Sequence, residues 1–264
     1  MDARGSRASR SGAPALGQHF LSRRLASELV RRARVEPDDL VVEIGAGTGV
    51  LTAALAARAR AVIAVEVDAR LARGLRSTFA GVPVVRVVEA DVRSWGFPRE
   101  PYRVLGNVPF AITTEVLRQL LDDPTSPMSR ADLVVQLEVA RKRTQDPPRS
   151  VRSLVWGPWW TFSVGRRIPA RSFRPPPAVD AAMLTIRRRD PPLLPPGELE
   201  PFERLLRRLF LTSDRPVVRC LRSVVGSQAG RVASDVGLSH RARSTDLRVI
   251  DAVALFRRVR RTLG

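Results

Sequence analysis

The stretch Leu40-Val41-Val42-Glu43-Ile44-Gly45-Ala46-Gly47-Thr48-Gly49 decides the fold. Its first five residues are mostly apolar and β-branched, which predicts a short buried strand over residues 40–44. The alternate glycines predict a tight turn, and the Ala/Leu-rich run that follows predicts a helix over residues 48–58. A buried strand that enters a helix through glycines is typical of an α/β sheet that binds a ligand at the turn.

The same alternation continues on both sides of this stretch. Ser22 is suited to cap a helix over residues 23–33. Further helices are predicted over residues 69–79 and 113–121, and strands over residues 61–67, 82–90, 102–106 and 131–140, the last of which runs into a short helix. Strands that alternate with helices of this length indicate βαβ units and a parallel, Rossmann-like sheet.

The C-terminal third has a different pattern. Two late strands are predicted over residues 156–168 and 178–189, around a kinked segment at Arg174–Pro177, and the proline-rich stretch 191–197 indicates a linker. Helical periodicity without any strand signal follows over residues 202–210, 217–225 and 248–263. We expect an α/β domain over residues 16–190 and a small all-helical domain over residues 198–264, preceded by a flexible basic arm over residues 1–15.

The charge of the chain predicts a polyanionic partner. The 264 residues carry 45 Lys and Arg against 26 Asp and Glu, a net charge of +19, and Lys142 is the single lysine. Arginine binds phosphate with two parallel hydrogen bonds and stacks on bases, so nucleic acid is favoured over an anionic membrane surface. A basic surface with no polyanionic partner is the alternative.

Several classes are excluded by composition. One cysteine, Cys220, excludes a disulfide framework, and two histidines leave almost nothing for a zinc cluster, so no metal is expected. No apolar run reaches the ~20 residues of a membrane span. The basic N-terminus lacks the apolar segment of a secretory signal. We expect a monomeric cytoplasmic protein that does not bind membranes.

The glycine turn has the spacing of a particular ligand class. Gly45, Gly47 and Gly49 form G-x-G-x-G, whereas dinucleotide-binding turns have G-x-G-x-x-G, and the G-K-[ST] of phosphate-binding loops is absent. A tight turn directly after the acidic Glu43 suits S-adenosylmethionine, whose methionine part is positively charged. The alternative is a turn that is purely structural.

Two acidic residues follow the next two strands. Glu66 lies about twenty residues beyond the glycines, where a carboxylate can accept both ribose hydroxyls. Asp91 follows the third strand and can accept a hydrogen bond from the adenine amino group of the cofactor. Either acid alone is compatible with a solvated loop, but the pair with the glycine turn indicates a cofactor site.

The segment Gly106-Asn107-Val108-Pro109-Phe110 at the end of the fourth strand indicates the chemistry. An adenine amino group is a poor nucleophile because its lone pair is delocalised into the ring. The Asn107 amide oxygen and the Val108 carbonyl can accept its two N–H bonds, and Pro109 makes the turn rigid. Phe110 offers a face on which the base can stack. An ordinary Asn-x-Pro β-turn is the alternative.

Several segments are candidates for RNA contact. Residues 181–264 contain 17 Arg and 8 Asp or Glu, a surplus of nine positive charges. We expect phosphate contacts from Arg187, Arg188, Arg189, Arg207 and Arg208. The run Arg141-Lys142-Arg143 either contacts RNA near the site or is a solvated helix end. Packing in the core is favoured over base stacking for Trp156, Trp159, Trp160 and Phe162.

The order of these motifs resembles the rRNA adenine-N6 dimethyltransferase family over nearly the whole chain. The resemblance begins at Gly17-Gln18-His19-Phe20-Leu21 and includes the glycine turn, residues 64–68, 89–92 and 106–110. It continues through residues 135–143 and Phe173–Ala181. It implies an S-adenosylmethionine-dependent methyltransferase sheet with a helical RNA-binding tail. It also implies that the cofactor is lined by His19, Leu21, Gly45, Glu66, Asp91 and Asn107, to which we add their neighbours Gly47, Val67 and Val92.

Two positions depart from the family pattern. Phe110 stands where Tyr is usual, which preserves the stacking ring, and Ala111 stands where Asn is usual, which removes one polar contact.

The Trp-rich stretch and helical tail look like Erm-type enzymes, which add one or two methyl groups to a 23S rRNA adenine and give resistance to macrolides, lincosamides and streptogramin B. The alternatives are a KsgA-type enzyme that acts on 16S rRNA and a non-catalytic relative that only binds nucleic acid.

Overall fold

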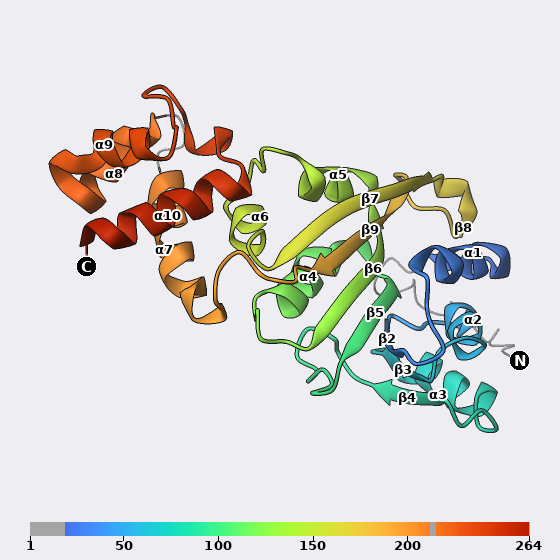
Figure 1. Ribbon diagram of the computed structural model, residues 1–264. Helices are drawn as coiled ribbons and strands as arrows, with labels where there is room; N and C mark the ends of the chain where they lie inside the picture. Colours follow the sequence, from blue (N-terminus) through green and yellow to red (C-terminus); the bar gives the residue numbers. More distant parts are fainter. Residues whose placement is uncertain (1–18, 212–214, 264) are drawn as a thin grey trace, which may run out of the picture.

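The structure is a computed structural model that describes residues 19–211 and 215–263. Figure 1 shows a mixed sheet with its helices at one end of the molecule and a group of helices, the tail, at the other. The basic arm predicted over residues 1–15 lies outside the described residues, as do Gly17 and Gln18.

Helices separate most strands of the main sheet, as predicted, although β5 follows β4 without one, and the α/β fold class is confirmed. The strands are β2 (Leu40–Ile44), β3 (Ala61–Glu66), β4 (Val85–Glu89), β5 (Tyr102–Asn107), β6 (Met128–Gln136), β7 (Trp160–Ile168) and β9 (Ala181–Arg188). The helices of this part are α1 (Arg23–Ala33), α2 (Val50–Ala56), α3 (Ala69–Thr78), α4 (Thr113–Leu121), α5 (Leu137–Thr144) and α6 (Val151–Trp156). The tail contains α7 (Leu199–Phe210), α8 (Val217–Val225), α9 (Ala229–Asp235) and α10 (Val249–Leu263).

The strand order creates a crevice at one edge of the sheet. The order is β4-β3-β2-β5-β6-β9-β7, and the first five strands are parallel, while β9 is antiparallel to both of its neighbours. The chain proceeds outward from β2 through β3 to β4 and then returns to β5 on the other side of β2. In such sheets the ligand binds beyond the carboxyl ends of the strands where the order reverses.

Side chains of successive strand residues point to opposite faces of the sheet, and different helices pack on the two faces. Val41 packs with buried residues of α1 and α2, whereas Val42 and Ile44 pack in a larger cluster that includes α4. All five residues of β2 are buried, which explains its almost continuously apolar sequence.

The strand predicted over residues 156–168 is β7, which begins four residues later, at Trp160, because residues 151–156 form helix α6. Ser150 caps this helix by accepting a hydrogen bond from the Ser153 amide, and Trp156 donates its indole N–H to Asp122 at 2.7 Å. Trp156, Trp159 and Trp160 are buried, which confirms the packing interpretation of these tryptophans.

The tail is all-helical, as predicted, but it shares a core with the sheet. Trp159 contacts Phe202 of α7 edge to face at 6.5 Å between ring centroids, and Phe202 contacts Phe256 of α10 at 5.4 Å. The segment expected to be a linker is also packed, because Leu194 is buried and the Leu193 amide donates to the Pro158 carbonyl. One apolar cluster therefore extends from β2 to α10.

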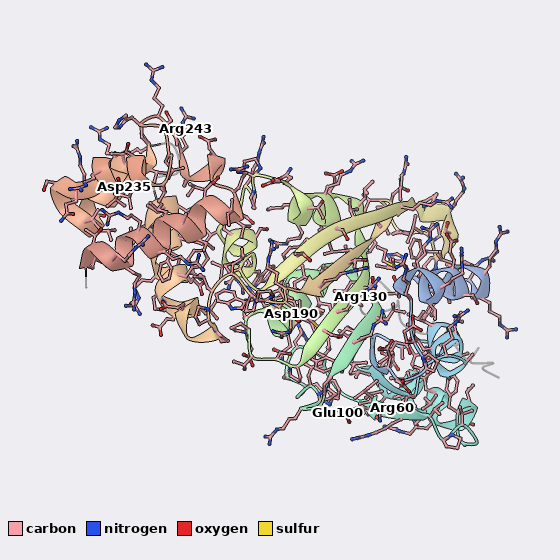
Figure 2. The ribbon with its side chains drawn as sticks, in the orientation of Figure 1. Arg60, Glu100, Arg130, Asp190, Asp235 and Arg243 are labelled. Atoms are coloured by element: carbon pink, nitrogen blue, oxygen red, sulfur yellow. The ribbon has the colours of Figure 1, made fainter. Side chains whose placement is uncertain are left out.

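Arginine side chains project from the surface of both the sheet and the tail (Figure 2). Arg60 and Glu100, which the figure labels, form an ion pair of 3.0 Å that joins the turn before β3 to the segment before β5. Within residues 19–211 and 215–263, no helix is both long enough and apolar enough to cross a membrane.

Candidate active site

A pocket opens at the carboxyl ends of β2, β3 and β5, where the strand order reverses. Its empty volume is about 920 Å³. Every residue predicted to bind the cofactor or the target adenine lines it: His19, Leu21, Gly45, Gly47, Glu66, Val67, Asp91, Val92, Asn107, Val108, Pro109 and Phe110. Residues that are far apart in the sequence are thus brought together in one site.

The glycine turn forms the floor of this pocket. Gly45, Gly47 and Gly49 have φ values of 70°, 58° and 81°, a backbone conformation that residues with a side chain rarely adopt. A Cβ atom on Gly47 would lie 3.2 Å from the ring of Phe20, so the turn also lets Phe20 pack closely over it.

Glu66 is held rigidly beside the turn. Its side chain accepts the Gly47 amide at 2.8 Å on one oxygen and the Asp68 amide at 2.9 Å on the other, and the residue is buried. Each carboxylate oxygen keeps a second lone pair for a ligand hydroxyl group.

Glu43 is buried beneath the pocket with one oxygen unpartnered. Its Oε2 accepts the Thr52 hydroxyl at 2.6 Å, while Oε1 has no hydrogen-bond partner among the described residues. Burial, and to a smaller extent the nearby charge of Glu66, raise the pKa of Glu43 to about 8. The carboxyl group is therefore mostly protonated at neutral pH in the ligand-free protein.

We expect Glu43→Gln to flatten the pH dependence of stability. Between the ordinary carboxyl pKa and about 8, the folded protein keeps a proton that the unfolded chain releases, so this group makes stability fall as pH rises, on the order of 1 kcal/mol per pH unit. A glutamine side chain does not titrate, and it still accepts the Thr52 hydroxyl. Urea unfolding of both proteins from pH 5 to pH 8 measures the difference, and equal pH slopes would contradict the burial of a neutral carboxyl.

Asp91 is paired with Arg93, a partner that no sequence motif indicated. Arg93 donates through Nε and Nη2 to both carboxylate oxygens, with an Nη2–Oδ2 distance of 2.5 Å. This hydrogen bonding lowers the pKa of Asp91. The carboxylate is thus ionised and held in one orientation at the edge of the pocket.

The Asn107 amide is oriented by a contact with the N-terminal segment. Its Nδ2 donates to the His19 carbonyl at 2.5 Å, which leaves Oδ1 as the acceptor, and no described residue donates to Oδ1. The Val108 amide donates to the Val134 carbonyl on β6, which fixes the peptide after Asn107. Phe110 begins a short 3-10 turn after Pro109 and is only partly buried.

The segment around His19 is fastened over the pocket by a second sheet. The strand β1 (Phe20–Leu21) pairs antiparallel with β8 (Phe173–Arg174), and His19 Nδ1 lies 2.8 Å from the Pro175 carbonyl oxygen. The His19 ring is 5.8 Å from the Phe110 ring. Two-residue strands have no periodicity, so no sequence pattern indicated this pairing.

The structure divides the predicted RNA contacts into two groups. Arg188 donates to the Met128, Pro124 and Ser126 carbonyls and lies over the Trp160 ring, and Arg189 donates to the Gly157 carbonyl. Arg143 contacts Ser150, Ser153 and the Trp156 ring. These three side chains therefore bind the protein itself, and burial lowers their pKa values. The side chains exposed to solvent are Arg141, Lys142, Arg187, Arg207 and Arg208.

The pocket residues fit S-adenosylmethionine. Glu43 lines the pocket, and its buried Oε1 lacks a partner among the described residues. A cationic group of the ligand would supply that partner and favour the ionised carboxylate. Glu66 and Asp91 lie on the adjacent strand ends and provide acceptors for hydroxyl and amino groups, and Gly45 and Gly47 of the glycine turn line the same pocket.

The family profile described as "Ribosomal RNA adenine dimethylase" matches residues 10–260. An rRNA adenine N-6-methyltransferase of Corynebacterium diphtheriae is 35% identical over 206 residues, which are 78% of this chain and 80% of that protein. The mycinamicin-resistance protein MyrB of Micromonospora griseorubida is 37% identical over 79% of this chain and 66% of its own length. An rRNA methyltransferase of Streptomyces thermotolerans is 40% identical over 74% of this chain and 65% of its own length.

Solved structures lead to the same family. The crystal structure of the 23S rRNA methyltransferase ErmE has a TM-score of 0.79 and 33% identity, and the match covers 91% of this chain and 99% of that one. A dimethyladenosine transferase of Plasmodium falciparum has the same fold, with a TM-score of 0.76 at 20% identity. The chain belongs to the ribosomal RNA adenine dimethylase family of rRNA adenine-N6 methyltransferases.

Proposed function

We propose that this enzyme transfers methyl groups from S-adenosylmethionine to the N6 amino group of one adenine in 23S rRNA. The observation that carries the proposal is the turn Asn107–Phe110, which lines the same pocket as the glycine turn, Glu66 and Asp91. The Asn107 amide oxygen in this turn receives no hydrogen bond from any described residue. The likeness to ErmE and to a mycinamicin-resistance protein supports 23S rRNA as the substrate. Resistance to macrolides, lincosamides and streptogramin B is the expected consequence.

The donor is held by groups on three strand ends. Glu66 would accept hydrogen bonds from the ribose hydroxyls, and Asp91 would accept one from the adenine amino group. Glu43 lies on the strand that leads into the glycine turn and suits the positively charged methionine part. Gly45, Gly47, His19, Leu21, Val67 and Val92 complete the lining. When bound, the donor supplies an electrophilic methyl group.

The protein acts on the acceptor nitrogen. Asn107 Oδ1 and the Val108 carbonyl accept hydrogen bonds from the two N–H groups of the target amine. These bonds favour a tetrahedral nitrogen whose lone pair is free to attack the methyl group. The orientation of the amide depends on the Nδ2 bond to His19, so the N-terminal segment both covers the pocket and aligns the acceptor. Phe110 is partly exposed and offers a stacking face for a base that has left its helix.

Methylation of two RNA substrates tests the proposal and its alternatives. We expect transfer to protein-free 23S rRNA and none to intact small ribosomal subunits, with the methylated base identified by primer extension. Modification of the small subunit alone would favour the KsgA-type alternative, and cofactor binding without transfer to either substrate would favour a non-catalytic binder. We propose that the enzyme acts as a monomer, because one chain supplies every residue of the pocket described here. We propose that it needs no metal, because the described residues contain no group of His, Cys, Asp and Glu that could hold one, and that it acts in the cytoplasm, where its proposed substrate is.

The exposed basic residues are proposed to position the RNA without reading its sequence. Lys142 and Arg141 lie on α5, Arg187 is near the end of β9, and Arg207 and Arg208 lie on α7. Arg141 and Arg207 also form ion pairs with Glu138 and Glu203 on their own helices. An RNA phosphate would have to compete with these carboxylates for the two arginines.

We expect the triple variant Arg187→Gln, Arg207→Gln, Arg208→Gln to weaken RNA binding but not donor binding. Each lost phosphate contact should reduce the slope of log K against log salt concentration by roughly 0.7–0.9. RNA affinity measured at several salt concentrations, with donor affinity measured by calorimetry, gives the result. An unchanged slope would mean that these side chains are a solvated surface.

A further inference from the structure

Two adjoining clefts lie along helix α1, on the side away from the tail. One has an empty volume of about 1,070 Å³ between α1, β7 and β8, and the other has about 1,160 Å³ between α1 and α2. They share Arg24, Glu28 and Arg166, so they form one continuous surface. We call it the α1 face and define it by the arginines that line it: Arg24, Arg31, Arg32, Arg58, Arg166, Arg171 and Arg174.

The α1 face has far more positive charge than its own acids can neutralise. All seven arginines are exposed, and Glu28 is the one acidic residue that lines either cleft. Glu28 is shared between Arg32, at 2.9 Å, and Arg166, at 3.8 Å. The other five arginines of the face form no ion pair with any residue in the described ranges.

The α1 face begins at the mouth of the active site. Phe20 and Leu21 line both the cofactor pocket and the first cleft. Arg174 pairs with Phe20 in the small sheet, and the next residue, Pro175, contacts His19. A polyanion on this face would therefore lie beside the segment that orients Asn107.

The α1 face and the tail lie at opposite ends of the molecule. Figure 1 shows α1, α2 and β8 at one end and α7–α10 at the other, with the sheet between them. Nitrogen-tipped side chains project outward from α1 in Figure 2. A basic surface thus adjoins the active site on the side opposite the tail.

The chemistry of the α1 face favours nucleic acid over a lipid surface. The exposed residues of α1 are arginines and Ser27, whereas its apolar residues Ala26, Leu29 and Val30 are buried against the sheet. A helix that lies in a membrane interface needs an exposed apolar face, which α1 lacks. Arginine forks match the phosphates of a backbone.

We propose that the α1 face binds backbone phosphates of the substrate rRNA, on the side of the target adenine opposite the tail. The inference rests on the proposed function for the identity of the RNA. The protein would then hold the strand on both sides of the flipped base, and the tail would supply one of two binding surfaces.

The test compares two triple variants of equal charge. Arg24→Gln, Arg31→Gln, Arg58→Gln removes three charges from the α1 face without changing any residue of the cofactor pocket. Arg73→Gln, Arg86→Gln, Arg99→Gln removes three exposed arginines from α3, β4 and the segment before β5. For an rRNA fragment, we expect the slope of log K against log salt concentration to fall by about 2 in the first variant and to stay unchanged in the second. Donor affinity should be equal in all three proteins.

A second measurement uses the unaltered protein and does not depend on how the variants fold. Bound rRNA should protect Arg24, Arg31 and Arg58 from modification by phenylglyoxal, as read by mass spectrometry, and should leave Arg73, Arg86 and Arg99 reactive. Equal slopes in the two variants, or equal reactivity of the two sets, would overturn the proposal. If the unaltered enzyme methylates no adenine of 23S rRNA, the proposed function fails, while the slopes and protection patterns still report on the α1 face.

Discussion

Replacing Asn107 with alanine will lower the rate of methyl transfer at least a hundredfold, on the order of 3 kcal/mol. Losses of this size accompany the removal of one hydrogen-bonding group that stabilises a transition state. The alanine variant loses the Oδ1 acceptor for the target amine, and it also loses the Nδ2 bond that ties the pocket to His19. Single-turnover transfer to protein-free 23S rRNA at saturating donor measures the effect on chemistry apart from that on binding.

Two further variants separate the contributions of the turn. Asn107→Asp keeps an acceptor oxygen but cannot donate to the His19 carbonyl, so a rate between those of the wild type and Asn107→Ala would show that both ends of the amide contribute. Phe110→Tyr keeps the stacking ring and should remain active, whereas Phe110→Ala should lose roughly 1–3 kcal/mol of base stacking. Turnover of Asn107→Ala near the wild-type rate would remove Asn107 from the catalytic site.

The position of the site could be predicted because it depends on strand ends. Gly45, Glu66, Asp91 and Asn107 each follow or end a strand with a clear apolar pattern, and parallel strands place their carboxyl ends at one edge. Local pattern and sheet topology therefore sufficed to bring these residues together.

The partners of the site residues could not be predicted in the same way. Arg93 lies two residues from Asp91, and nothing in the sequence distinguishes it from other exposed arginines. The protonated state of Glu43 depends on how completely tertiary packing excludes water. The pairing of β1 with β8 joins residues more than 150 positions apart through two-residue strands that carry no periodic signal.

The run Arg187-Arg188-Arg189 shows why charge alone does not identify an RNA surface. The three residues are identical in the sequence, yet Arg187 is exposed, while Arg188 satisfies three backbone carbonyls and lies over Trp160. Neighbouring residues in a strand point to opposite faces, which separates Arg187 from Arg188 at the end of β9. Arg189 follows the strand and donates to the Gly157 carbonyl, so two of the three arginines bind the protein itself. Conversely, the basic surface along α1 combines the arginines of that helix with Arg58, Arg166, Arg171 and Arg174 from distant parts of the chain, so no single segment indicates its extent.

Because Phe202 packs between the sheet and the tail, we expect Phe202→Ala to lower the free energy of unfolding by about 3–5 kcal/mol. Phe202 is fully buried and contacts Trp159 on one side and Phe256 on the other, so its removal leaves a cavity in the cluster shared by both parts. Amides of β9 and of α10 should lose protection from hydrogen exchange together, because they belong to one cooperative unit. Phe202→Leu fills most of the cavity and should lose less. If α10 alone loses protection in Phe202→Ala, the tail unfolds independently, and the division into separate domains predicted from the proline-rich segment 191–197 is supported.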